Sequence, residues 1–360
     1  MVALTGHLLG ASRLEEDSAV ASLAGNLCRC TGYAGIRRAV GKLAATLKEL
    51  GPPGKARVGR LIALGVLPAY FGAVPAKLSA SSPAAAALRR DDRVVVGGGT
   101  DLLVASPGKL RDRPLRFLGR EERLRGVVRE GDAISIGAAT TAAELMESPV
   151  IEEHLPDLRR ALELFASPLV RNRATVGGNL VNASPIGDLS VALLALGSKV
   201  TLEKDESRRV VALEDLYLGY KSLALAPGEI VARVDIPLPA PGAHFRFEKV
   251  SRRRLLDIAG VNCAIAISAE HGVVGAARLS AGGVAPVPLL LSKSSRWLAG
   301  RPISEETVRG AIAQARAEIA PIGDVRGSAA YKALLLERLV WGHFAALYPD
   351  AIRALYGVAP

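Results

Sequence analysis

Two glycine-rich segments, far apart in the chain, constrain the fold more than any other feature of the sequence. The first, residues 94–103 (V-V-V-G-G-G-T-D-L-L), is a β-branched run that enters three glycines and then an apolar stretch. Glycines permit positive φ and close approach of the backbone, so consecutive N–H groups can converge on a diphosphate. A tight turn between strand and helix is the alternative. The pattern is neither G-x-G-x-x-G nor a Walker loop with its lysine, which disfavours both families.

The second segment, residues 170–188, concentrates small and hydrogen-bonding residues inside an otherwise aliphatic chain. Its polar side chains could bind ribityl, ribose and phosphate oxygens, while its paired glycines leave space for them. These residues are Thr175, Asn179, Asn182, Ser184 and Asp188, with Gly177 and Gly178 between them. A buried polar turn is the alternative. Two such segments predict a long ligand lying across one domain, and a dinucleotide has that shape.

The net charge of +11 would attract phosphates or acidic partners, and it raises the question of nucleic-acid binding. Aromatic residues make up only 4% of the chain, and the one dense basic run, residues 252–254, has no aromatic neighbours for base stacking. We therefore expect no nucleic-acid partner. A surface for a dinucleotide or for an acidic partner subunit explains the charge.

The cellular setting is predicted from what the chain contains. No uninterrupted apolar run reaches the ~18 residues of a membrane span, and residues 1–13 lack the basic-then-apolar order of a secretory signal. Cys28 and Cys30 are too close together for a comfortable disulfide. We expect no membrane contact, a reducing compartment and a cytoplasmic location.

Periodicity predicts an α+β multidomain protein. Residues 1–50 have a helical pattern, and 51–73, which begin with G-P-P-G, are expected to be a linker. Residues 74–239 alternate short β-like runs with helical ones, whereas 240–348 place strands before helices, as in a separate α+β domain. The expected strands include 93–96, 133–137, 199–202, 230–234, 259–267 and 272–279, and the expected late helices are 305–319 and 328–346.

Three strings carry a resemblance to the FAD domain of the xanthine dehydrogenase family of molybdenum hydroxylases, in the fold shared with vanillyl-alcohol oxidase (PCMH type). They are V-V-G-G-G-T-D-L, R-A-T-V-G-G-N-L-V-N-A-S-P-I-G-D and K-V-S-R-R-R-L-L-D-I-A. N-L-C-R-C-T-G-Y at 26–33 resembles the end of the family's 2Fe-2S domain. A-G-G-V-A-P at 281–286 resembles its CO dehydrogenase flavoprotein C-terminal domain. The resemblance implies a 2Fe-2S remnant at 1–50, an FAD domain at 74–239 and a flavoprotein C-terminal domain at 240–348.

The resemblance also implies which residues contact FAD. Residues 95–102 would wrap the phosphates and ribityl, 175–179 would close over the diphosphate, and Asp188 would hold a cofactor hydroxyl or a neighbouring loop. Phe165 would lie against the isoalloxazine, Lys249 would stabilise negative charge on reduced flavin, and Ile230 would make a backbone contact. The complete expected set is Val95, Val96, Gly97, Gly98, Gly99, Thr100, Asp101, Leu102, Phe165, Thr175, Val176, Gly177, Gly178, Asn179, Asp188, Ile230 and Lys249. Core or surface roles are the alternatives for Phe165 and Lys249.

Cys28 and Cys30 resemble two of the four thiolate ligands of a 2Fe-2S cluster. The other pair is absent, and Cys263 lies in an apolar run that reads as a buried strand. A misplaced start codon, a split gene and a decayed copy are all compatible with this sequence. We expect the polypeptide to bind FAD and to need another chain to complete the cluster.

The leading hypothesis is a redox relay. Electrons from molybdenum in a partner subunit cross iron–sulfur centres, and FAD in this chain passes them to NAD or another acceptor. Leu255 and Leu256 stand where relatives often carry polar residues, which weakens the case for NAD.

The alternative function is that of a non-catalytic assembly subunit, favoured by the missing cysteines. The five histidines have no metal-binding or hydrolytic spacing, and the sequence leaves the substrate open.

Overall fold

The computed structural model describes residues 2–11, 15–23, 34–47, 50–80, 93–105, 107–253 and 256–353. The chain divides into two compact units, Met1–Arg89 and Arg90–Pro360. Among the described helices, none is long and apolar enough to cross a membrane.

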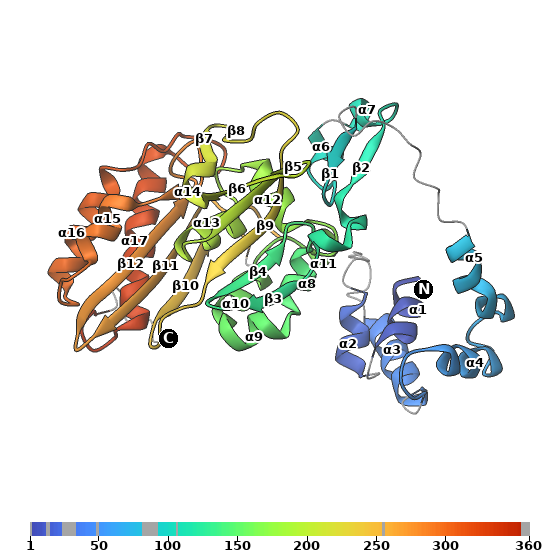
Figure 1. Ribbon diagram of the computed structural model, residues 1–360. Coiled ribbons are helices and arrows are strands. Elements are labelled where there is room, and N and C mark those ends of the chain that lie inside the picture. Colours follow the sequence, from blue (N-terminus) through green and yellow to red (C-terminus); the bar gives the residue numbers. More distant parts are fainter. Residues whose placement is uncertain are drawn as a thin grey trace. The chain divides into compact units, whose positions relative to one another are not determined.

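The first unit is helical (Figure 1). It contains α1 (Val2–Gly10), α2 (Glu16–Ala21), α3 (Ala34–Thr46), α4 (Lys55–Ala63), the 3-10 helix η1 (Ala69–Ala73) and α5 (Val74–Ala80). Aliphatic side chains from these helices and from the turns between them form its core, which includes Leu4, Leu8, Val40, Leu61 and Leu67. The helical pattern expected at the start of the chain is therefore present in its described residues.

The segment expected to be a linker, residues 51–73, contains a helix in the structure. No helix runs through residues 51–54, as expected, and Gly51 and Gly54 have positive φ, but α4 begins directly after them. Leu61 of this helix is fully buried. Arg57, 2% exposed, donates hydrogen bonds to backbone carbonyls, including that of Leu8 at 3.2 Å. The basic, glycine-containing composition gave no clear sign of a helix. The helix is amphipathic, and burial of its one apolar face in the core of the unit stabilises it.

The second unit begins with a small lobe. Strand β1 (Val94–Val96) pairs in parallel with β2 (Leu115–Phe117), and the short helices α6 (Leu102–Ala105) and α7 (Pro107–Leu110) connect them. Two 3-10 turns, η3 (Leu118–Arg120) and η4 (Glu122–Leu124), lead out of the lobe. The first glycine-rich segment therefore follows a strand, as expected.

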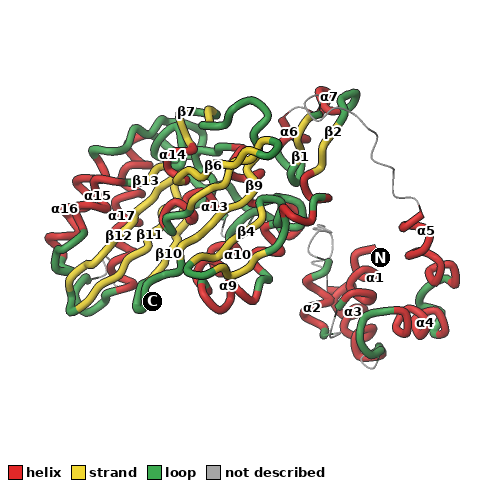
Figure 2. Tube along the Cα trace, viewed as in Figure 1, coloured by secondary structure: helices red, strands yellow, loops and turns green. Residues whose placement is uncertain are grey.

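A five-stranded antiparallel sheet forms the centre of the second unit, with strand order β3-β4-β9-β5-β6 (Figure 2). The strands are β3 (Val127–Glu130), β4 (Ala133–Gly137), β5 (Lys199–Lys204), β6 (Ser207–Ala212) and β9 (Ile230–Pro237). The strands expected at 133–137, 199–202 and 230–234 are confirmed. Ile134, Ile136, Val200, Val234 and Ile236 are fully buried, because alternate residues of each strand face the helices that follow.

Helices pack on this sheet and carry the second glycine-rich segment. They are α8 (Ala142–Met146), α9 (Pro149–His154), α10 (Pro156–Glu163), α11 (Pro168–Arg171), α12 (Val176–Asn182), α13 (Asp188–Ala195) and α14 (Leu213–Leu216). All eight residues of α13 are buried. It lies against strands of the next domain as well as its own, which explains why it has no polar face.

The C-terminal domain is a four-stranded antiparallel sheet, β10 (His244–Val250), β11 (Val261–Glu270), β12 (Val273–Gly282) and β13 (Leu289–Leu290). Helices α15 (Ser292–Leu298), α16 (Glu305–Arg316) and α17 (Ala329–Leu347) pack together beside this sheet (Figure 1). Val261, Cys263 and Ile265 of β11 pack in a core with residues of these three helices. Ala264 packs in the other core, which contains α13. Both faces of β11 are thus covered, and the expected order of strands before helices is confirmed.

Candidate functional site

The two glycine-rich segments touch each other. Gly97 and Gly98 follow the end of β1 and press against residues 173–178. A methyl group on Gly97 would lie 2.6 Å from the Thr175 hydroxyl oxygen, and one on Gly98 would overlap the backbone carbonyl of Arg173. Gly99 has a φ of 76°, which disfavours any other residue. Glycines at these positions therefore allow a backbone contact that side chains would block.

Thr175 fixes the second loop. It forms an isolated bridge with Thr141 and caps α12, whose Gly178 amide donates to the Thr175 hydroxyl at 3.1 Å. The amides of Val176 and Gly177 donate to the carbonyls of residues 140 and 138, at 3.0 and 2.8 Å, and the amide of Asn179 donates to the Thr175 carbonyl. The amides of 176–179 are therefore already used inside the protein. The second loop could therefore contribute its side chains to a ligand, as the sequence suggests, while its amides hold the loop itself together.

The first loop does offer such groups. Among the described residues, no acceptor is found for the backbone N–H groups of residues 97–101. Unsatisfied amides on a tight loop are the arrangement that binds anionic oxygens, because each N–H carries a partial positive charge. The carbonyls of Gly99 and Asp101 are used in starting α6. The loop therefore exposes donors while its own structure stays hydrogen-bonded.

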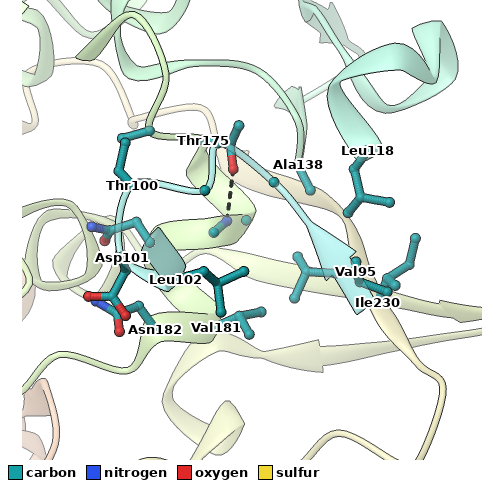
Figure 3. A pocket seen from close by; sticks show the side chains of 18 of the residues that line it. Val95, Thr100, Asp101, Leu102, Leu118, Ala138, Thr175, Val181, Asn182 and Ile230 are labelled. Carbon is teal, nitrogen blue, oxygen red and sulfur yellow. Dashed lines mark hydrogen bonds between the residues drawn. The ribbon is translucent and has the colours of Figure 1, made fainter. Parts of the chain in front are cut away.

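A cavity of about 690 Å³ opens beside the contact between the two loops (Figure 3). Its volume is within the range of cofactor sites. Thirteen of the seventeen residues expected to contact FAD line it: Val95, Gly97, Gly98, Gly99, Thr100, Asp101, Leu102, Phe165, Thr175, Gly177, Gly178, Asn179 and Ile230. Four do not, namely Val96, Val176, Asp188 and Lys249. Val96 and Val176 are buried on the core side of their elements.

One part of the cavity wall is apolar and suits a flat ring system. Val95, Leu118, Ala138, Ile230 and Val231 meet here from β1, η3, the end of β4 and the start of β9. Figure 3 shows the side chains of Val95, Leu118 and Ile230 close together. Thr100, Asp101 and Asn182 also line the cavity, and Figure 3 draws them on the other side of the view. The cavity thus combines an apolar region with a hydrogen-bonding one, as a dinucleotide requires.

Phe165 is the one aromatic side chain on the cavity wall within the described residues. It follows α10, and its neighbour Ala166 has a φ of 48°, which turns the chain sharply. Arg171 donates to the Phe165 carbonyl at 2.7 Å, and burial lowers the pKa of this guanidinium. The turn after α10 therefore places the Phe165 ring on the cavity wall.

Asp188 and Lys249, which are not among the residues lining the cavity, form a buried ion pair. The Lys249 ammonium is 2.6 Å from the Asp188 carboxylate, and the side chains are 3% and 10% exposed. Asn262 donates to the other carboxylate oxygen at 2.6 Å, and Lys249 also donates to the Leu164 carbonyl at 3.1 Å. Burial raises the pKa of Asp188, and the ammonium and amide oppose that rise. The pair joins α13 of the expected FAD domain to β10 of the C-terminal domain.

Sequence reasoning missed a hairpin at the cavity. Strands β7 (Tyr217–Gly219) and β8 (Ser222–Leu223) form it, and Lys221, Leu225 and Glu229 on or after it line the wall. The carboxylate of Glu229 is paired with Arg209 at 2.7 Å, which lowers its pKa to about 2. No motif marks these residues, because their place on the wall depends on how a loop folds back.

The cysteines give no metal centre within the described residues. Cys28 and Cys30, the expected cluster ligands, lie outside the described residues. Cys263 is fully buried in β11, and burial raises the pKa of its thiol, so it is a small apolar core residue as expected. In the described part of the chain, no group of three or more His, Cys, Asp or Glu could hold a metal ion.

Two family models match the chain, and both agree with the fold. Residues 73–239 match an FAD-binding domain in molybdopterin dehydrogenase, and residues 246–346 match a CO dehydrogenase flavoprotein C-terminal domain. The class is therefore a flavoprotein with an FAD-binding domain and a dedicated C-terminal domain. The small lobe from β1, the five-stranded sheet and their glycine-rich loops fall in the first match, and the four-stranded sheet falls mostly in the second.

Individual relatives define the family further. The carbon monoxide dehydrogenase medium chain of Afipia carboxidovorans is 33% identical over 64% of this chain and 77% of the relative. A putative xanthine dehydrogenase FAD-binding subunit of Escherichia coli is 27% identical over 67% of this chain and 84% of its own length. A solved structure of carbon monoxide dehydrogenase from Hydrogenophaga pseudoflava, which lacks the Mo-pyranopterin moiety, superposes with a TM-score of 0.66. It is 31% identical and covers 69% of this chain and 87% of that one.

The chain belongs to the family of FAD-binding medium subunits of molybdenum hydroxylases, oxidoreductases in which this subunit works with a partner. The xanthine dehydrogenase-like resemblance in the sequence is confirmed at this level.

Proposed function

We propose that this chain binds FAD in the cavity of the second unit and passes electrons from a molybdenum-containing partner subunit through FAD to NAD or another acceptor. One observation carries the proposal. Five consecutive amides, at residues 97–101, have no acceptor among the described residues and lie on the wall of a cavity whose remaining surface is largely apolar. FAD, when bound, supplies reversible uptake and release of two electrons singly or together.

The residues present fit the cofactor. The amides of 97–101 would hold the diphosphate, because anionic oxygens match aligned N–H donors. Gly97 and Gly98 leave no bulk where Thr175 and Arg173 approach, so the loop can keep this conformation. Val95, Leu118 and Ile230 would pack against an aromatic ring, and Phe165 would shield the isoalloxazine. Thr175 and Asn179 would close the site from the second loop.

The ion pair of Asp188 and Lys249 would act on the flavin indirectly. Neither residue lies on the cavity wall, so we assign them the positioning of residues that do. Cys28 and Cys30 are retained as proposed ligands of a 2Fe-2S cluster on the resemblance alone. Residues 1–50 are proposed as part of a 2Fe-2S domain, 51–73 as its connection to the FAD domain, and 240–348 as the C-terminal flavoprotein domain. A large molybdenum-binding subunit is the proposed partner. Support comes from a relative named as a medium chain and from a solved relative whose description mentions a molybdenum cofactor. A cytoplasmic location is proposed for the complex.

Reconstitution tests the proposal directly. The purified chain, incubated with FAD and passed through a desalting column, is expected to retain about one flavin per chain, measured by its absorption spectrum. Anaerobic addition of NADH is then expected to bleach the bound flavin. Retained flavin that NADH leaves oxidised, while dithionite reduces it, would reject NAD as the acceptor. A colourless protein would reject FAD binding itself.

A further inference from the structure

The hairpin β7–β8 brings a single cation to the cavity. Lys221, in the turn between the two strands, is the one Lys or Arg side chain on the cavity wall within the described residues. It lies on the same wall as residues 97–101, whose amides have no acceptor in the described ranges. The wall assigned to an anionic ligand therefore includes one cationic residue.

Hydrogen bonds hold the Lys221 ammonium in place. It donates to the backbone carbonyl of Asn182 and to the Asn182 side-chain oxygen, the latter at 2.6 Å. An ammonium has three N–H groups, and the third has no acceptor in the described part of the chain. Asn182 itself lines the cavity. Lys221 is thus anchored by two donors and keeps one for a ligand.

The backbone on both sides of this contact is in an unusual conformation. Lys221 has a φ of 54° and Ala183, which follows Asn182, has a φ of 49°. Residues other than glycine rarely adopt such values, and they persist where the surrounding structure enforces them, often at binding sites. Lys221 is in the two-residue loop between β7 and β8, and Ala183 is the C-cap of α12, both places where the backbone favours positive φ. The hairpin turn and the end of α12 therefore fix the backbone on both sides of the contact between Lys221 and Asn182.

Two other charged residues, Glu229 and Asp101, line the cavity with Lys221. Glu229 is neutralised by Arg209, so Lys221 and Asp101 are the charged wall residues for which the described part of the chain shows no ion pair. Asp101 lines the same cavity as Asn182, the partner of Lys221. An uncompensated carboxylate there would repel a diphosphate. Lys221 offsets Asp101 and supplies a donor to a phosphate oxygen.

From these contacts we propose that Lys221 binds the diphosphate of the dinucleotide and makes the cavity select phosphate-bearing flavins over riboflavin. The proposal rests on the proposed function, since it assigns a residue to the same cavity. It differs from a helix-capping role, in which Lys221 only satisfies the last carbonyls of α12. A cap stabilises the fold equally for every ligand, whereas a phosphate contact acts on phosphorylated ligands alone.

The test compares FAD with riboflavin in the full chain. Lys221→Met keeps the apolar stem and removes the charge. It is expected to weaken FAD binding about tenfold, the effect of one charge-assisted hydrogen bond, and to change riboflavin binding less than about twofold. Between roughly 50 and 500 mM salt, FAD affinity is expected to fall less steeply in the variant than in the wild type. Adding Asp101→Asn, which keeps an oxygen acceptor and removes the repelling charge, is expected to recover part of the loss.

Two controls make the outcome decisive. Lys293→Met removes an exposed lysine on α15, outside the cavity, and is expected to leave both affinities unchanged. Lys221→Arg keeps the charge and is expected to keep the salt dependence. Lys221→Gln, which also removes the charge, replaces Lys221→Met if the latter does not fold. Equal losses for FAD and riboflavin, or no loss for either, would overturn the role of Lys221. A wild-type chain that binds neither flavin would instead reject the proposed function.

Discussion

The contact between the two glycine-rich loops predicts a graded response to single methyl groups. Gly98→Ala places a methyl group into the backbone carbonyl of Arg173, which no rotamer change can relieve. Gly97→Ala meets the Thr175 hydroxyl at 2.6 Å, about 0.4 Å inside the 3.0 Å that real contacts respect. Gly108→Ala on α7 meets nothing within 4 Å. The three variants share one chemical change and differ only in what surrounds it.

The magnitudes follow from these contacts. Gly98→Ala is expected to lower the free energy of unfolding by about 3 kcal/mol, the upper part of the overpacking range, because backbone must move. Gly97→Ala is expected to cost about 1 to 2 kcal/mol, since Thr175 can turn away but then loses its capping bond to α12. Gly108→Ala is expected to be neutral or stabilising by about 0.5 kcal/mol. In a unit of this size, each kcal/mol corresponds to roughly 2–4 °C in melting temperature.

The same contact also predicts a change in FAD affinity. Parting the loops at Gly98 would misalign the amides of 97–101, and loss of two charge-assisted hydrogen bonds of about 1.5 kcal/mol each weakens binding about 100-fold. Thermal unfolding of the apo protein and flavin fluorescence titration measure the two effects separately. A Gly98→Ala protein that melts within about 2 °C of the wild type and binds FAD within threefold would refute this account of the loops.

Three further predictions concern single contacts. Thr175→Ala is expected to cost about 1 kcal/mol in urea unfolding through loss of the α12 cap, and Thr175→Ser is expected to restore it. Lys249→Met is expected to lower the free energy of unfolding by about 3–5 kcal/mol, because it leaves the buried carboxylate of Asp188 without its partner. Adding Asp188→Asn should recover part of that loss. If the losses of the two single variants simply add, the two residues are not a direct pair. Burial lowers the pKa of His343 to about 3 from an ordinary 6.5. Its contribution to stability is therefore full above pH 6.5 and is lost as pH falls toward 3, so unfolding of His343→Leu is expected to depend less on pH in that window.

Local patterns in the sequence were sufficient for most of the fold. The strands at 133–137 and 230–234 alternate apolar and polar or consist of buried β-branched runs, so their period is visible without any tertiary information. The helix α17 shows its apolar residues at helical spacing over nineteen residues. Helix α4 was missed because nine residues rich in Lys, Arg and Gly carry a weak helical signal, and burial of Leu61 by other helices stabilises it.

The site shows the limit of local reasoning more clearly. Glycines in both loops marked where backbones approach, and the structure places those glycines in contact. Which amides remain free depends on partners distant in sequence: Val176 and Gly177 donate to the segment that follows β4, and only the fold reveals this. Lys221 was invisible for the same reason, since its contact with Asn182 spans 39 residues. Composition can predict a phosphate-binding loop but cannot predict which donors are already occupied.

A buried lysine of the C-terminal domain contacts the segment that carries Phe165. Among the described residues, none of that domain lies on the cavity wall. Lys249 of β10 nevertheless donates to the carbonyl of Leu164, the residue directly before Phe165, while its charge is held by Asp188. The domain therefore fixes the backbone that presents the one aromatic side chain on that wall. A substitution that displaced Lys249 is therefore expected to shift the backbone of Leu164 and with it the position of the Phe165 ring.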